Sequence, residues 1–306
     1  MTDQVEKARR FLALHRGQQP LLLPNPWDRG SAVLLASLGF EALATTSSGF
    51  AATLGRADGQ VTRDQALEHA AWIVQATDLP VTADLESGFA DEPAGVAETV
   101  RLAAAAGLAG CSVEDFTGDA DDPIYDAGLA AARVEAAAEA AHRGPVRLVL
   151  TARAENHLHG RDDLADTVAR LQAYQEAGAD VLYAPGLTRL DDIRQVVSSL
   201  DRPVNVLARP GVPAVPELAA AGVARVSVGG GFAFAALGAL VEAAGELRDA
   251  GTYGFWDRAA IGARAAASAF TSREGAREDL EDPRGEVAGG VQVGPEVGHA
   301  DAEQPG

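Results

Sequence analysis

Acidic, hydroxyl-bearing and cationic side chains follow several apolar, strand-like runs of this sequence. Asp84 and Glu86 close the run at 80–84, and Glu114 closes the run at 109–115. If the first strand continues through Glu86, its two acids point to the same side, and Glu114 approaches them from the neighbouring strand. Converging carboxylates repel one another unless a cation neutralises them, and oxygen-only ligands suit a hard ion. The pattern predicts a Mg²⁺ site at Asp84, Glu86 and Glu114, with Mn²⁺ as the alternative ion.

The same acids have a second interpretation, in which they cap the following helices or pair with arginine. Arg153, at the end of the run 146–152, is a candidate clamp for a substrate carboxylate or phosphonate, because its planar guanidinium binds such groups bidentately. Its alternative role is to neutralise Glu114 or Glu155. The turn at 46–49 offers consecutive N–H groups and hydroxyls, which suit either a carboxylate nest or an ordinary turn.

Three other features carry weaker signals. The glycines at 229–231 precede a helical pattern and suit either a phosphate cradle or close packing of a helix on a strand. His157 and His159 follow the same strand as Arg153 and are candidate proton donors or solvated loop residues. Cys111 lies within an apolar run and is expected to be a buried hydrophobic residue.

Eight short apolar runs, each followed by a segment of helical periodicity, must position these groups. The runs lie at 21–24, 41–46, 80–84, 109–115, 146–152, 179–185, 203–207 and 224–230. Such alternation implies right-handed crossovers and a parallel sheet. Eight units close most naturally into a (β/α)8 TIM barrel, in which functional groups gather at the carboxyl ends of the strands. An open doubly wound sheet is the alternative, although no GxGxxG follows the first run.

Residues 1–270 are therefore expected to form one barrel domain with an N-terminal helix and a C-terminal helical extension. After about residue 251 the sequence continues with helical patterns and no strand between them. Residues 271–306 are rich in Glu, Asp, Gly and Pro, which predicts a disordered acidic tail.

The net charge limits the partners that the chain can bind, and the cysteine count limits its disulfides. The net charge of −19 and the scattered Lys and Arg residues exclude a nucleic-acid partner, so an anionic small molecule must be held by local cations, metal or backbone N–H groups. The single cysteine cannot form a disulfide within the chain. We find neither a signal-peptide pattern nor an apolar run of roughly 18 residues, which predicts a cytoplasmic protein without a membrane partner.

Five segments, taken in order, resemble the isocitrate lyase/phosphoenolpyruvate mutase superfamily over about residues 10–255. They are PNPWDRGSA at 24–32, TTSSGFAATLGRADG at 45–59, VTADLESGFAD at 81–91, SVED at 112–115 and TARAEN at 151–156. The resemblance implies that the N–H groups of Thr46 and Ser47 hold a substrate carboxylate and that Asp58 is a catalytic loop acid. It also implies that Asp84 holds Mg²⁺, that Glu86 and Glu114 act largely through metal-bound waters, and that Arg153 grips the anionic end of the substrate. Further candidate substrate-binding residues are Gly49, Asn156 and Asn205.

Some features depart from that superfamily and predict a divergent branch. The K(K/R)CGH loop of the isocitrate and methylisocitrate lyases is replaced by residues 116–123, the lysine- and asparagine-bearing loop of the mutases is missing, and Tyr183-Ala184-Pro185 replaces a His. Glu86 replaces the usual second Asp. The candidate proton donors are His157, His159 and Tyr183.

The resemblance implies an enzyme that stabilises an enolate. The expected activity is a Mg²⁺-dependent lyase or decarboxylase acting on a small 2-oxo or 2-hydroxy di- or tricarboxylate, similar to methylisocitrate, dimethylmalate or oxaloacetate, and releasing pyruvate or a similar 2-oxo acid. The alternatives are a phosphonomutase or phosphonopyruvate hydrolase, and a non-catalytic barrel that binds 2-oxo acids. The resemblance also implies a homo-oligomer, a dimer of dimers in which the helix at 254–270 swaps between subunits.

Overall fold

Eight parallel strands form a single sheet in residues 3–281, the part of the chain that the computed structural model describes. The strands are β1 (Leu21–Leu23), β2 (Leu43–Ala44), β3 (Val81–Asp84), β4 (Gly110–Glu114), β5 (Val149–Arg153), β6 (Val181–Tyr183), β7 (Val204–Leu207) and β8 (Arg225–Ser227). Their order is β1-β8-β7-β6-β5-β4-β3-β2. The Ala44 N–H donates to the Pro24 carbonyl at 3.0 Å and links β2 to the end of β1. The predicted (β/α)8 TIM barrel is confirmed.

Strand register determines which side chains share the rim of the barrel. Arg153 lies opposite Glu114 on β4 and opposite Tyr183 on β6, while Asp84 of β3 lies opposite Ser112. Because the strands are parallel, their carboxyl ends meet at one rim. The candidate acids and Arg153 are therefore brought to the same end of the barrel.

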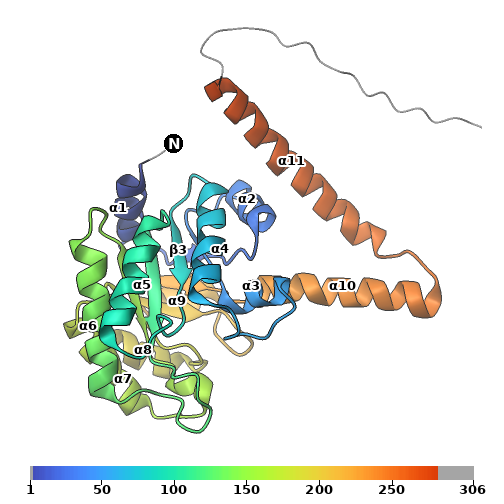
Figure 1. The fold of residues 1–306 in the computed structure, drawn as a ribbon. Coiled ribbons are helices and arrows are strands. Elements are labelled where there is room, and N and C mark those ends of the chain that lie inside the picture. Colours follow the sequence, from blue (N-terminus) through green and yellow to red (C-terminus); the bar gives the residue numbers. More distant parts are fainter. Residues whose placement is uncertain (1–2, 282–306) are drawn as a thin grey trace, which may run out of the picture.

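Helices cover the outside of the barrel (Figure 1). They are α2 (Arg29–Ser37), α3 (Ser47–Thr53), α4 (Arg63–Gln75), α5 (Pro93–Ala105), α6 (Ala127–Arg143), α7 (Leu164–Glu176), α8 (Leu190–Ser198) and α9 (Val215–Ala220), with a short 3-10 helix, η1 (Asn156–His159). The predicted N-terminal helix is α1 (Gln4–Leu14). Its Phe11 is fully buried against residues such as Leu21 and Val149, which begin their strands, so α1 covers the amino-terminal end of the barrel.

Local sequence signals explain where helices begin and end. Thr62 caps α4 and forms a capping box with Gln65. Four helices are followed by a glycine with φ between 85° and 107°, a left-handed conformation that is strained for residues with a side chain. These glycines are Gly39, Gly107, Gly178 and Gly222.

Two long helices form an arm after the last strand. Helix α10 (Gly231–Ala250) leaves the barrel, and α11 (Trp256–Glu281) runs back at an angle and packs on α2 (Figure 1). Helix α11 continues past the expected boundary at residue 270, so residues 271–281 are helical. The rest of the expected acidic tail, residues 282–306, lies outside the described residues. None of the helices in residues 3–281 is both long and apolar enough to cross a membrane.

Candidate functional site

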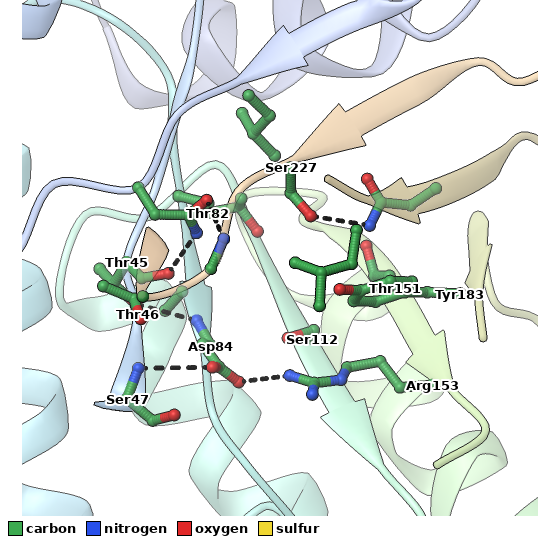
Figure 2. Close-up of a pocket in the computed structure, with 18 of the residues that line it drawn as sticks. Thr45, Thr46, Ser47, Thr82, Asp84, Ser112, Thr151, Arg153, Tyr183 and Ser227 are labelled. Carbon is green, nitrogen blue, oxygen red and sulfur yellow. Dashed lines mark hydrogen bonds and ion pairs between the residues drawn. The ribbon is translucent and has the colours of Figure 1, made fainter. Parts of the chain in front are cut away.

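A cavity of about 190 Å³ opens at the carboxyl ends of the strands, and all eight strands contribute to its lining. Figure 2 shows Ser47, Asp84 and Arg153 in a row along one side of the cavity, with Thr151, Tyr183 and Ser227 on another side. The lining is mostly polar side chains at strand ends, together with Thr46, which caps α3, and the first residues of that helix. This is the position at which a barrel places its functional groups.

Arg153 lies at the centre of a group of acids. Its Nη1 is 2.9 Å from Asp84 Oδ1, its Nη2 is 3.0 Å from Glu114 Oε2, and its Nε is 2.7 Å from Glu155 Oε1. All four side chains are largely buried, with exposed fractions from 2% for Glu155 to 18% for Asp84. Arginine pairing, the second interpretation of the acids, therefore describes the contacts that Asp84 and Glu114 make in this structure.

Burial and mutual repulsion act on these ionisable groups. Burial raises the pKa of Glu114 well above its ordinary value, although the Arg153 charge opposes that shift. Burial disfavours the charge on Arg153, but Glu114 and Glu155 outweigh this effect and hold the Arg153 pKa above its ordinary range. Arg153 therefore stays cationic at neutral pH.

Asp84 connects the acids to the turn at 46–49. Its carboxylate accepts from the Ser47 N–H at 3.4 Å and from the Glu86 N–H at 3.3 Å, while its own N–H donates to Thr45 Oγ1 at 2.9 Å. These contacts hold the Asp84 carboxylate between Arg153 and the turn, where it lines the cavity.

The strand alternation predicted for Asp84 and Glu86 is wrong. Strand β3 ends at Asp84, and Glu86 lies in the following turn with φ of 49°, a left-handed conformation that is uncommon outside glycine. Its carboxyl is nevertheless close enough to the other acids to interact with them. Burial first, and then the charges of Asp84 and Asp58, raise the pKa of Glu86 to about 7.

The predicted three-acid cage is not formed in this structure. Within residues 3–281, no three His, Cys, Asp or Glu side chains are arranged to hold a metal ion. Mg²⁺ does not require such a cage, because it keeps several waters and binds through one or two carboxylates. The donors of Asp84, Glu86 and Glu114 are all oxygens, and the charges of Asp84 and Asp58 add to burial in raising the pKa of Glu86. A donor set of this kind fits a hydrated Mg²⁺.

The other predicted substrate-binding residues separate into two groups. Thr46, Ser47 and Asn205 line the cavity. Gly49 is buried in α3, donates its N–H to Thr46 Oγ1 at 3.3 Å, and leaves no room for a side chain beside the Thr46 methyl group. Asn156 is fully buried in η1 and donates to Asp166 Oδ2 at 2.6 Å. Gly49 and Asn156 are not among the residues that line the cavity.

Asp58 lines the cavity, as a catalytic role requires. It lies in the loop between α3 and α4, and its carboxylate accepts a hydrogen bond from the Gly59 N–H at 3.2 Å. Partial burial raises the pKa of Asp58, while a hydrogen bond with the Ser47 side chain opposes that shift. Asp58 and Ser47 therefore lie together at the cavity.

One of the three candidate proton donors lines the cavity. This is Tyr183, whose pKa burial raises to about 12. His157 contacts Thr167 Oγ1 at 3.2 Å instead, and His159 stacks on Phe116 with their ring centroids 3.8 Å apart.

The structure also accounts for the weaker signals. Cys111 is fully buried, and burial raises the pKa of its thiol to about 12, so it is the expected apolar core residue. The N–H groups of Val228 and Gly229 both donate to Asn25 Oδ1, at 3.0 and 2.9 Å. Gly230 packs closely against Ser48 and Phe234. The packing contacts expected of this run are therefore present, and Gly229 and Gly230 also line the cavity.

Sequence reasoning missed Arg225 as a cavity residue. Arg225 begins β8, is 4% exposed and lines the cavity. The available signal was a charged residue within an otherwise apolar or small strand run, ARVSVGG at 224–230.

Comparison with known proteins identifies relatives of this chain. The family model described as phosphoenolpyruvate phosphomutase matches residues 11–248. An uncharacterized protein of Mycobacterium tuberculosis is 33% identical over 221 residues, which cover 72% of this chain and 81% of the relative. The 2-methylisocitrate lyase of Bacillus subtilis is 29% identical over 217 residues, 68% of each chain.

Solved structures show the same architecture. A protein of Burkholderia cenocepacia, assigned as a lyase or mutase, is 54% identical and superposes with a TM-score of 0.81 over 82% of this chain and 91% of its own. A 2,3-dimethylmalate lyase is 28% identical, with a TM-score of 0.73 over 83% of this chain and 90% of its own. A phosphonopyruvate hydrolase, solved with oxalate and Mg²⁺, shares the fold at 23% identity, with a TM-score of 0.77 over 90% of this chain and 98% of its own.

Proposed function

This chain belongs to the phosphoenolpyruvate phosphomutase family, and on that premise we propose that it is a Mg²⁺-dependent lyase or decarboxylase. Its substrate is a small 2-oxo or 2-hydroxy di- or tricarboxylate, the reaction proceeds through an enolate, and one product is pyruvate or a similar 2-oxo acid. The observation that carries the proposal is the Arg153–Asp84 ion pair, which lies beside Thr46 and Ser47 in one cavity.

Arg153 and the turn bind the anionic end of the substrate. A guanidinium has five N–H donors, and the contacts with Asp84, Glu114 and Glu155 occupy one on each nitrogen. One N–H on each Nη remains for a ligand. Glu114 and Glu155 hold the guanidinium in place. The N–H groups of Thr46 and Ser47 would receive the opposite side of the carboxylate, the Ser47 N–H exchanging its present contact with Asp84 for the substrate.

Asp84 would hold Mg²⁺ directly, and Glu86 and Glu114 would bind its waters; Mn²⁺ would fit the same oxygen donors. The bound ion would act as a Lewis acid that stabilises negative charge on the C2 oxygen. A cation at this position would also relieve the repulsion among Asp58, Asp84 and Glu86.

Two groups of this chain move protons. Asp58 accepts the proton of a substrate 2-hydroxyl, a role suited to a carboxylate with a raised pKa at the edge of the cavity. When the C2–C3 bond breaks, its electron pair remains on the departing fragment, and Tyr183 donates the proton that quenches it. The high pKa of Tyr183 keeps its hydroxyl protonated at neutral pH.

The proposal is tested with a panel of 2-oxo and 2-hydroxy di- and tricarboxylates, assayed with Mg²⁺ for release of pyruvate, glyoxylate or oxalate. We expect turnover of at least one member, abolished by EDTA and restored by Mg²⁺. Binding without turnover across the panel would contradict the lyase and indicate a non-catalytic barrel.

The matching family model supports a second candidate, which is phosphorus–carbon chemistry. A phosphonomutase or phosphonopyruvate hydrolase would change the ³¹P NMR spectrum of phosphonopyruvate. An unchanged spectrum, together with cleavage of a carboxylic acid from the panel, excludes this candidate.

Exposed apolar side chains on the arm support a homo-oligomer, expected to be a dimer of dimers. Leu240 and Val241 of α10 are 63% and 71% exposed, and Trp256 and Ile261 of α11 are 64% and 63% exposed. Large apolar side chains that stand together on a projecting arm typically mark an interface. A second copy that exchanges the α10–α11 arm would cover them.

A further inference from the structure

Arg225 carries a buried positive charge in the interior of the barrel. It lies two residues before Ser227, where β8 ends, just as Thr151 lies two residues before Arg153 on β5. Both therefore lie one layer deeper than the groups at the rim. We call this deeper layer the floor of the cavity.

The partners of Arg225 in the described part of the chain are all uncharged. Its Nε donates to Asn205 Oδ1 at 2.9 Å, its Nη1 lies 3.2 Å from His15 Nε2, and its Nη2 donates to Thr151 Oγ1 at 3.1 Å. The other hydrogen bonds of these partners determine which atom donates to, and which accepts from, Arg225. Asn205 uses its Nδ2 to donate to Ser227 Oγ at 3.0 Å, so its carbonyl oxygen faces Arg225.

His15 is a neutral acceptor. Its Nδ1 lies 2.8 Å from the Phe11 carbonyl, which can only accept, so Nδ1 carries the hydrogen and Nε2 has a free lone pair for Arg225. Burial first, and then the charge of Arg225, lower the pKa of His15 to about 3. His15 therefore adds no second positive charge, and it cancels none of the charge on Arg225.

A guanidinium held by neutral acceptors keeps its positive charge. Burial and the charge of Arg153 lower the pKa of Arg225 to about 10, so it remains cationic at neutral pH. Removing a cation from water without an anionic partner is strongly unfavourable. Arg153 avoids that cost through its carboxylates, whereas Arg225 has only dipoles.

Hydroxyl groups gather around the same part of the cavity. Thr82 and Thr151 lie two residues before the strand-end residues Asp84 and Arg153, and Ser112 lies opposite Thr151. All three line the cavity, and Figure 2 shows them on the strands that surround it. The acidic lining residues, Asp58 and Asp84, belong to the rim instead. The floor thus combines one cation with rotatable hydroxyl donors, the composition of a site for a small anion.

We propose that Arg225 forms a second anion-binding subsite, which holds a carboxylate at the far end of the substrate. This inference rests on the proposed function, because the near end of that substrate is held at Arg153. It makes Arg225 a determinant of specificity: the cavity selects 2-oxo acids that carry a second negative charge over acids of the same length that end in a methyl group.

The test compares matched pairs of ligands by calorimetry on the full chain, with Mg²⁺ and again with EDTA. One pair is 2-oxobutanoate and oxaloacetate, and the other is 2-oxopentanoate and 2-oxoglutarate; within each pair a terminal methyl group replaces a carboxylate. We expect at least one diacid to bind ten-fold or more tightly than its partner. Arg225→Met should bring that ratio close to one while leaving the affinity for the monoacid within about two-fold.

A second buried arginine provides a matched control. Arg133 is 1% exposed, stacks on Tyr125 and is not among the residues that line the cavity, so Arg133→Met should keep the ratio. If Arg225→Met does not fold, Thr151→Val removes one floor hydroxyl with little change of shape and should reduce the ratio. Equal affinities within both pairs for the wild type, or an unchanged ratio in Arg225→Met, would overturn the inference.

The EDTA measurements separate this inference from the proposed function. A diacid preference that depends on Arg225 and persists in EDTA, in a protein whose ligand binding ignores Mg²⁺, would leave the subsite standing and remove the metal proposal. Metal-dependent binding without any diacid preference would support the metal proposal and remove the subsite.

Discussion

Asp84 Oδ1 and Arg153 Nη1 lie 2.9 Å apart, so the proposed metal ligand and the proposed substrate clamp neutralise each other before any ligand arrives. A cation that binds Asp84 in place of Arg153 frees one N–H of Arg153 to bind the substrate. Metal binding and substrate binding should therefore strengthen each other. Both require the Asp84–Arg153 contact to break, and the ligand that binds first breaks it for the second.

Removing the forked geometry of Arg153 should impair both catalysis and folding. In Arg153→Lys a single ammonium replaces three directed contacts with Asp84, Glu114 and Glu155. We expect kcat/KM to fall about 10²-fold and the free energy of unfolding to fall by about 2 kcal/mol, measured by steady-state kinetics and urea denaturation. Arg161→Lys, at an exposed pair with Asp122, is the control and should change neither quantity. Wild-type kinetics in Arg153→Lys would remove the clamp from the mechanism.

Tyr183→Phe tests the proton donor. The substitution keeps the ring and removes only the hydroxyl, so kcat should fall about 10²-fold while the affinity for oxalate stays within about two-fold. Tyr253→Phe, at an exposed site in the connection between α10 and α11, controls for the loss of a tyrosine hydroxyl. If both variants turn over like the wild type, another group donates the proton.

Glu86 should make the stability of the metal-free protein depend on pH. Its folded-state pKa of about 7 lies above its ordinary value of 4.5, so the folded protein holds a proton that the unfolded chain has released. The free-energy cost of ionising Glu86 in the folded protein is absent below pH 4.5. It grows between pH 4.5 and pH 7 and is complete above pH 7. We expect Glu86→Gln to gain about 1–3 kcal/mol relative to wild type across this pH range in EDTA.

Thermal or urea unfolding at several pH values measures this gain, and Glu92→Gln, at the start of α5, serves as the control. Mg²⁺ should shrink the difference, because a cation favours the ionised carboxylate. A constant difference between wild type and Glu86→Gln from pH 4.5 to pH 8 would show that folding does not raise the pKa of Glu86.

The α10–α11 arm should mediate association. Light scattering coupled to size exclusion should give wild-type protein the mass of an oligomer, and Val241→Glu should lower that mass because it places a charge on the exposed apolar face of α10. Leu38→Glu introduces the same charge at a comparably exposed position on the barrel and should leave the mass unchanged. A monomeric wild type would contradict the oligomer.

The sequence was sufficient for the barrel and for the strand-end residues of the site, because both follow from periodicity. Asp84, Glu114 and Arg153 reach one rim since they end neighbouring parallel strands. The position of Glu86 could not be predicted from periodicity, because its left-handed turn depends on packing beyond the strand. A 3-10 turn likewise directs Asn156 to Asp166, a contact that spacing along the chain does not encode.

Arg225 shows a different limit. Within the run 224–230 its neighbours are apolar or small, so alternation places it on a face without saying that neutral acceptors will surround it there. That environment depends on His15, 210 residues away along the chain, and on Thr151, 74 residues away. Contacts at such separations appear only once the barrel is closed.

Asp84 is proposed to bind a divalent cation that makes the cavity receptive to a 2-oxo acid. Calorimetric titration of oxalate into wild type and Asp84→Asn, with Mg²⁺ and with EDTA, tests this role. We predict that Mg²⁺ tightens binding to the wild type at least ten-fold and has no effect on the variant, which keeps the shape of the side chain but loses its charge. Equal oxalate affinity for both proteins, with and without Mg²⁺, would contradict it.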